Sequence, residues 1–145
     1  MSEMSGFDRR PTRQRDSEDP VARYLGELQT EVMGVFWDHE SATVREALEA
    51  MNKRRRRRKL AYTTVLTLVS RLWQRGLLER EAEGRGFRYR STRSRDALLG
   101  EFSDELIDRL FDDFGEIAVA RLGERLQQLD PARRKRLESA RKRRP

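Results

Sequence analysis

Hydrophobic positions recur with a helical period through most of this chain. Residues 1–22 are polar and lack any period, so we expect them to form a disordered tail. From residue 25 to about 38, apolar residues recur every three or four positions and predict a first helix, with Leu28, Val32, Val35 and Phe36 inward. A second helix is predicted as far as about Met51, capped by Ser41 or Thr43 and burying Val44, Ala47, Leu48 and Met51.

A third helix is predicted over residues 61–75, and its two faces differ in chemistry. At about 100° per residue, one side forms a core stripe of Val65, Leu68, Val69 and Leu72. The opposite side carries Thr63, Thr67, Ser70 and Gln74, flanked by Thr64 and Arg71. Gly76 is a typical terminator for such a helix.

The stretch that follows, LLEREAEGRGFRYRST, alternates between apolar and polar residues on both sides of a glycine-rich turn. A two-residue turn at Gly84 and Arg85 would place three pairs opposite each other: Glu81 with Arg88, Glu79 with Arg90, and Ala82 with Phe87. Three helices followed by a hairpin predict a winged helix-turn-helix domain over residues 23–93. The expected fold class is mainly α with a small β-hairpin.

Residues 94–145 are predicted to form a separate helical region with a basic C-terminal end. Its first apolar stripe has a strict four-residue spacing and contains Leu98, Phe102, Leu106, Leu110 and Phe114. After Gly115 a second stripe includes Leu122 and Leu126, and Asp130-Pro131 is typical of a last helix start. These helices cannot bury their apolar faces on each other alone. They either pack back on the N-terminal domain or pair with a second chain, and we favour a homodimer.

Charge is distributed unevenly along the chain. The formal net charge is +7, but residues 53–93 hold fourteen basic against three acidic side chains. Residues 131–145 hold eight basic and one acidic, whereas residues 94–130 are net acidic. A positive field concentrated in this way attracts polyanions, although basic loops that only maintain solubility are the alternative interpretation.

The third helix has the properties of a helix that enters the DNA major groove. Threonine is small enough to approach base edges, and its hydroxyl and methyl groups both find partners there. We therefore expect base reading at the N-terminal part of this helix, by Tyr62, Thr63, Thr64, Thr67 and Arg71. We expect phosphate contacts from Arg54, Arg55, Arg56, Arg57, Arg58, Arg85 and Arg88. A solvated arginine loop and threonines merely tolerated on a surface remain open alternatives.

Other classes of function lack the residues they require. The chain has no cysteine and a single histidine, His39, which is expected to lie on the surface. No catalytic motif or metal-ligand cluster is apparent, so we expect neither an enzyme nor a cofactor or metal site. No apolar run is long enough to span a membrane, and no signal peptide is recognisable. A cytoplasmic protein, associated with the nucleoid when bound to DNA, is expected.

Four blocks of the chain resemble the penicillinase-repressor family, the BlaI/MecI/CopY-type transcriptional regulators of bacteria. They are LGELQTEVMGVFWDHESATVREALEAM, LAYTTVLTLVSRLWQRGLLERE, GRGFRYR and LIDRLFDDFG, within residues 25–129. The resemblance implies a homodimer of winged-helix domains, joined through C-terminal helices, that represses transcription from a palindromic operator in double-stranded DNA. It also implies that Thr63, Thr64 and Thr67 read bases, with Arg71 nearby.

In the antibiotic-resistance members of this family, a membrane-bound sensor protease system leads to cleavage of the repressor in its dimerisation region. Alignment on EIAVARLGERL implies a cut near Arg121 and Leu122. The chain departs from the family in lacking the cysteines of copper-responsive members, and in having Leu66 where some members carry a basic residue. The arginine run and the N-terminal tail look like additions to the pattern of this family. A non-specific nucleic-acid-binding protein, or an interaction module with its hydroxyl face packed on protein, remain as alternatives.

Overall fold

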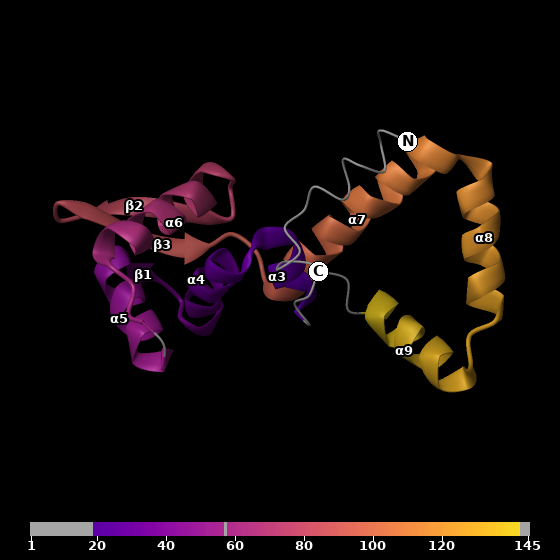
Figure 1. The fold of residues 1–145 in the computed structure, drawn as a ribbon, viewed down its shortest axis with the longest axis horizontal. Coiled ribbons are helices and arrows are strands. Elements are labelled where there is room, and N and C mark those ends of the chain that lie inside the picture. The colour runs from indigo at the N-terminus through magenta and orange to yellow at the C-terminus, as the bar shows by residue number, and fades with distance from the viewer. Residues whose placement is uncertain (1–18, 57, 143–145) are drawn as a thin grey trace. The chain divides into compact units, whose positions relative to one another are not determined.

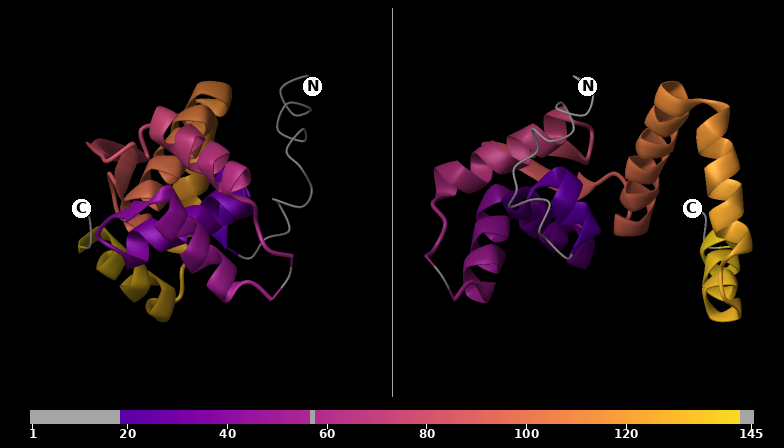
Figure 2. Two further views of the ribbon diagram at one scale, coloured as in Figure 1. Left: turned by 90° about the vertical axis from the view of Figure 1, so that its left-hand side faces the viewer. Right: turned by 45° about the vertical axis from the view of Figure 1, so that its right-hand side comes forward.

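The computed structural model describes residues 19–56 and 58–142 (Figure 1). The chain divides into two compact units, residues 1–95 and 96–145. The first unit contains helices and a small sheet, and the second contains helices alone in its described part. Further views of both units are given in Figure 2. Most of the predicted tail lies outside the described residues.

The first unit begins earlier than the sequence pattern predicted. Helix α3 (Pro20–Leu25) is capped by Asp19, whose carboxylate accepts a hydrogen bond from the Val21 N–H at 2.9 Å. The prediction of a tail through residue 22 is therefore wrong at its end, because Val21 and Ala22 are buried. Helix α4 (Glu27–Asp38) follows after Gly26, whose φ of 107° interrupts what was predicted as one helix from residue 25.

Helices α5 (Val44–Arg54) and α6 (Tyr62–Gln74) form the helix-turn-helix pair. Thr43 caps α5 through a capping box, in which its hydroxyl accepts from the Glu46 N–H and the Glu46 carboxylate accepts from the Thr43 N–H. Helix α5 extends through Arg54, so the first arginine of the basic run is helical and the loop begins at Arg55. Two basic residues in the last turn are favoured there by the helix dipole.

The hairpin has the predicted register. Strands β2 (Leu78–Glu83) and β3 (Gly86–Ser91) pair so that Glu81 lies opposite Arg88, with the other two predicted pairs also formed. A third strand, β1 (Ala42–Thr43), pairs with β3 and gives the order β1-β3-β2. This strand was not predicted, because two residues ahead of a helix carry no readable alternation.

The core of the first unit joins three helices to the inner face of the hairpin. Phe36 and Met33 from α4 and Met51 from α5 are among its largest fully buried side chains. The α6 stripe of Val65, Leu68, Val69 and Leu72 is buried as predicted. No polar or charged residue is buried anywhere in the described chain. Apolar burial is therefore the main force that orients the helix-turn-helix pair.

The second unit consists of α7 (Arg95–Phe114, whose first residue falls in the first unit), α8 (Glu116–Gln127) and α9 (Pro131–Lys142). The break at Gly115 and the start at Asp130-Pro131 match the prediction. Among the described residues of these helices only Leu98 and Ala118 are buried. None of the described helices is long and apolar enough to cross a membrane.

Candidate nucleic-acid interface

Helix α6 exposes the face that was predicted to read bases. Thr63, Thr64, Thr67 and Arg71 are all exposed, opposite the buried stripe. Within the described chain no side chain caps the N-terminus of α6, where Ala61 is the N-cap residue. The first backbone N–H groups are therefore open to water or to an anion, and the helix dipole favours an anion. The hydroxyl row and these N–H groups share one end of the helix.

The threonine hydroxyls are not equivalent. The Thr67 hydroxyl donates to the carbonyl oxygen of Thr63 at 2.9 Å. Its hydrogen is therefore engaged within the helix, and its oxygen remains available only as an acceptor. A hydroxyl oxygen of this kind can accept a hydrogen bond from the amino group of adenine or cytosine, and the threonine methyl can contact the methyl group of thymine.

Tyr62 at the start of α6 is paired with a residue that the sequence analysis did not single out. The Arg45 guanidinium from α5 lies over the Tyr62 ring, 5.1 Å from its centroid. Tyr62 is 40% exposed, and Arg45 is exposed beside it. The first helix of a helix-turn-helix crosses the DNA backbone. A basic residue near the start of the second predicted helix could therefore have been named as a candidate for phosphate contact from the sequence.

The arginine run has two distinct roles in the structure. Arg54 pairs with Asp38 at 3.0 Å, and Arg55 donates from one nitrogen to both carboxylate oxygens of Glu31, each at 2.9 Å. Arg55 is only 16% exposed and also donates to the carbonyl of Arg58. Arg54, the last residue of α5, and Arg55, the first residue of the loop, therefore hold the start of the loop on the body of the domain.

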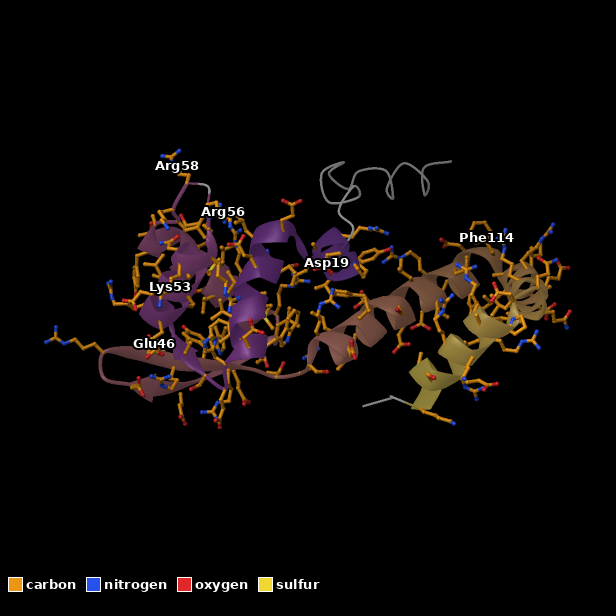
Figure 3. All side chains as sticks on the ribbon, turned by 90° about the horizontal axis from the view of Figure 1, so that it is seen from below. Asp19, Glu46, Lys53, Arg56, Arg58 and Phe114 are labelled. Atoms are coloured by element: carbon orange, nitrogen blue, oxygen red, sulfur yellow. The ribbon has the colours of Figure 1, made fainter. Side chains whose placement is uncertain are left out.

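The next arginines of the run are available. Arg56 and Arg58 are exposed, and neither side chain has a hydrogen bond or ion pair in the described part of the chain. Figure 3 shows Arg58 at the outer end of the loop between α5 and α6, pointing away from the helices. Arg57, also predicted to contact phosphate, lies outside the described residues. The Asn52 side chain fixes the end of the loop through two hydrogen bonds with the Leu60 backbone.

The two hairpin arginines that were predicted to contact phosphate, Arg85 and Arg88, have different surroundings in the structure. Arg85 is exposed in the turn between β2 and β3. Arg88 instead bonds Glu46 at 3.1 Å, Glu83 at 2.9 Å and the Ser41 hydroxyl at 3.2 Å. Its hydrogen bonds to Glu83 and Glu46 raise the pKa of Arg88. Arg88 thus connects the hairpin to the start of α5, and Arg85 is the hairpin arginine that remains available.

Arg80, another arginine of the hairpin, lies between two aromatic rings. The Arg80 guanidinium lies 3.5 Å from the centroid of the Trp73 ring and 3.8 Å from that of Phe87. Trp73 belongs to α6 and Phe87 to β3, so this stack connects the helix to the hairpin. Such a contact contributes about 0.5–1 kcal/mol at an exposed site. Sequence analysis did not find this stack, because the three residues are separated along the chain and only the tertiary fold brings them together.

These features define a winged helix-turn-helix protein whose open surface is built from small hydroxyls, exposed arginines and free helix N–H groups. His39 lies on the surface as predicted, with Nδ1 2.9 Å from the Val35 carbonyl oxygen. No group of metal-ligating side chains occurs among the described residues.

The family model for penicillinase repressors matches residues 25–142. The chain therefore belongs to the penicillinase repressor family, a family of regulators rather than enzymes. Two curated relatives, the Transcriptional regulator BlaI of two Mycobacterium tuberculosis strains (CDC 1551 / Oshkosh and ATCC 25618 / H37Rv), are each 40% identical over 76 residues. That match covers 52% of this chain and 53% of each relative, so the chain spans about half the length of those relatives.

A solved structure is also similar, the solution structure of the DNA-binding domain of the repressor BlaI. It is 30% identical, with a TM-score of 0.41, and the match covers 46% of this chain and 78% of that one.

Glu46 gives a test of how the hairpin is attached. The Thr43 backbone N–H and the Arg88 guanidinium both lower the pKa of Glu46 below 4.5. A carboxylate with a lowered folded-state pKa stabilises the fold above its unfolded pKa, and this stabilisation is lost as the pH falls through the folded-state value. We expect Glu46→Gln, which retains a capping-box acceptor, to lower the free energy of unfolding by less than about 1 kcal/mol at pH 7.

The loss caused by Glu46→Gln should shrink as the pH falls through the lowered folded-state pKa of Glu46, because the wild-type carboxyl then becomes neutral as well. Urea titrations followed by tryptophan fluorescence measure it, since both tryptophans, Trp37 and Trp73, lie in the first unit. Glu49→Gln on the same helix is the control. A loss that stays constant from pH 7 to the acid end of the titration would contradict the proposed charge interaction.

Proposed function

We propose that this protein is a homodimeric transcriptional repressor that binds a palindromic operator in double-stranded DNA. The observation that carries the proposal is the open hydroxyl face of α6, which adjoins the unpaired arginines of the loop before it. The major groove admits one α-helix, and short side chains allow its backbone to approach base edges. Membership of the penicillinase repressor family supports the same function.

The interface divides specificity from affinity. Thr63, Thr64 and Thr67 face the bases, with Tyr62 and Arg71 at the edges of that surface. Phosphate contacts come from Arg56, Arg58 and Arg85, with Arg45 added from α5. The carboxylate-bound arginines Arg54, Arg55 and Arg88 hold the loop and the hairpin in position. Contacts to phosphate add affinity without sequence information, whereas contacts to base edges select the site.

Dimerisation is supported by apolar surface that the single chain leaves uncovered. Phe102 and Leu106 are half-buried, and four further members of the predicted stripes are exposed: Leu110, Phe114, Leu122 and Leu126. Phe114 lies at the end of α7 (Figure 3). It is 56% exposed, whereas Leu98 is buried. Covering such an apolar face with a second copy is favourable, and two recognition helices then require half-sites about one helical turn apart.

Release of the repressor by proteolysis is the finer part of the proposal. Arg121 and Leu122 lie inside α8, and both side chains are exposed. A cut between them would detach the second half of α8 and all of α9 from the exposed apolar face of α7. The proposed membrane-bound sensor protease system would thus act on dimerisation, not on α6.

Base reading predicts a loss that depends on the DNA sequence. Thr63→Ala or Thr67→Ala should each cost about 1–3 kcal/mol on a duplex selected from a random pool, and little on a scrambled duplex. Fluorescence anisotropy titrations measure both affinities. Gln74→Ala, at the other end of α6, is the control. Equal losses on both duplexes would count against base reading, and a pool without an enriched inverted repeat would favour a non-specific binder.

The two roles of the arginine run can be separated by salt. Arg58→Gln should weaken binding to selected and scrambled duplexes alike, and lower the slope of log K against log salt by about 0.9. Arg54→Gln has the same change in charge, but it removes an arginine paired with Asp38 and should leave the slope unchanged. Equal slopes for the two variants would refute this division of roles.

The exposed stripe predicts the oligomeric state. The wild-type chain should sediment as a dimer at micromolar concentration, and Leu106→Asp with Leu110→Asp should give monomers, because two carboxylates would enter an apolar interface. Leu137→Asp on α9 is the control, since Leu137 is also exposed but lies outside the stripe. A monomeric wild type would overturn the proposed dimer.

A further inference from the structure

Helix α9 is a strongly basic element that the proposed interface does not use. The Asp130 carboxylate accepts a hydrogen bond from the Arg133 N–H at 2.8 Å, and Pro131 occupies the first helical position. The N-terminus of the helix is therefore capped. Its twelve residues carry six basic side chains, Arg133, Arg134, Lys135, Arg136, Arg141 and Lys142, against the single acidic Glu138. No residue of α9 is buried.

The basic side chains of α9 have no acidic partner among residues 19–56 and 58–142. No ion pair in the described chain involves them, and the one side-chain hydrogen bond among them is from Arg134 to the Gln127 carbonyl at 3.4 Å. At 100° per residue, Arg133, Arg134, Lys135 and Arg136 point in four directions around the helix. Like charges packed this densely repel one another, so a polyanion that neutralises them stabilises the helix.

A protein surface is a poor partner for this helix. Docking on protein requires an apolar seam, and the only large aliphatic side chain of α9 is Leu137. Helix α7 has the opposite character, with seven acidic residues and a continuous apolar stripe. The partner that fits α9 has a high density of negative charge and needs no apolar contact. Double-stranded DNA has about one charge per 1.7 Å of its axis.

We propose that α9 is a second contact for the phosphate backbone of double-stranded DNA, separate from the winged-helix surface. It adds affinity on any sequence and takes no part in selecting the operator. The proposal extends the proposed function, but it does not depend on base reading by α6. In a homodimer each chain contributes one such helix, so the second unit combines pairing through α7 and α8 with backbone binding through α9.

The test compares two variants of the full chain with equal net charge. Arg133→Gln with Arg136→Gln removes two charges from α9, and Arg121→Gln with Arg125→Gln removes two from α8. Each is titrated with a fluorescein-labelled duplex of random sequence over a range of salt. The α9 variant should lower the slope of log K against log salt by about 1.8 and weaken binding about tenfold at low salt. The α8 variant should retain the wild-type slope.

Two results would overturn the proposal. One is an α9 variant whose salt slope equals that of the wild type and of the α8 variant. The other is an α9 variant that sediments as a monomer with an unchanged slope, which would assign the helix to the acidic α7 of a second copy. Circular dichroism verifies that the helices are retained. Failure of base reading would appear separately, as equal wild-type affinity for selected and scrambled duplexes.

Discussion

The structure depends on the burial of one side of α6. Four aliphatic side chains of that helix face α4, α5 and the hairpin, and burying each contributes about 1.5–3 kcal/mol. This burial sets the rotation of the helix about its own axis, and so determines which residues remain outside. The row of threonines is exposed because it lies on the side of the helix opposite the aliphatic stripe, and that stripe is buried in the core. The proposed reading surface therefore follows directly from the packing of the core.

Arginine serves two purposes in the first unit, and a nearby carboxylate decides between them. Arg55 lies on Glu31 and Arg88 on Glu46 and Glu83, where multiple hydrogen bonds make the arginines part of the scaffold. Arg58 and Arg85 lie in an exposed loop and an exposed turn, and neither forms an ion pair in the described structure. The exposed arginines are thus positioned by a loop and a hairpin that the ion pairs of Arg55 and Arg88 hold in place.

The second unit separates its charges by helix. Acidic residues accompany the apolar stripe of α7, whereas basic residues surround α9. Acidic side chains around an apolar seam keep that part of the chain away from DNA and leave the seam for a partner, in the arrangement that we propose. Helix α9 lacks an apolar stripe that could pack against another helix, and its positive charge favours binding to a polyanion. Pairing and backbone binding are therefore assigned to different helices.

The sequence alone determined helices α4 to α9 apart from their exact ends, the hairpin register and the outward face of α6, because these follow from local periodicity and turn chemistry. It missed α3, whose six residues are too few to show a period. It also showed where positive charge gathers. Only the tertiary structure decided which arginines are free, since the carboxylates that hold Arg54, Arg55 and Arg88 come from residues distant along the chain. The Arg80 stack and strand β1 were likewise hidden. Local pattern predicts which face turns outward, but contacts between distant residues decide which of its charges remain available.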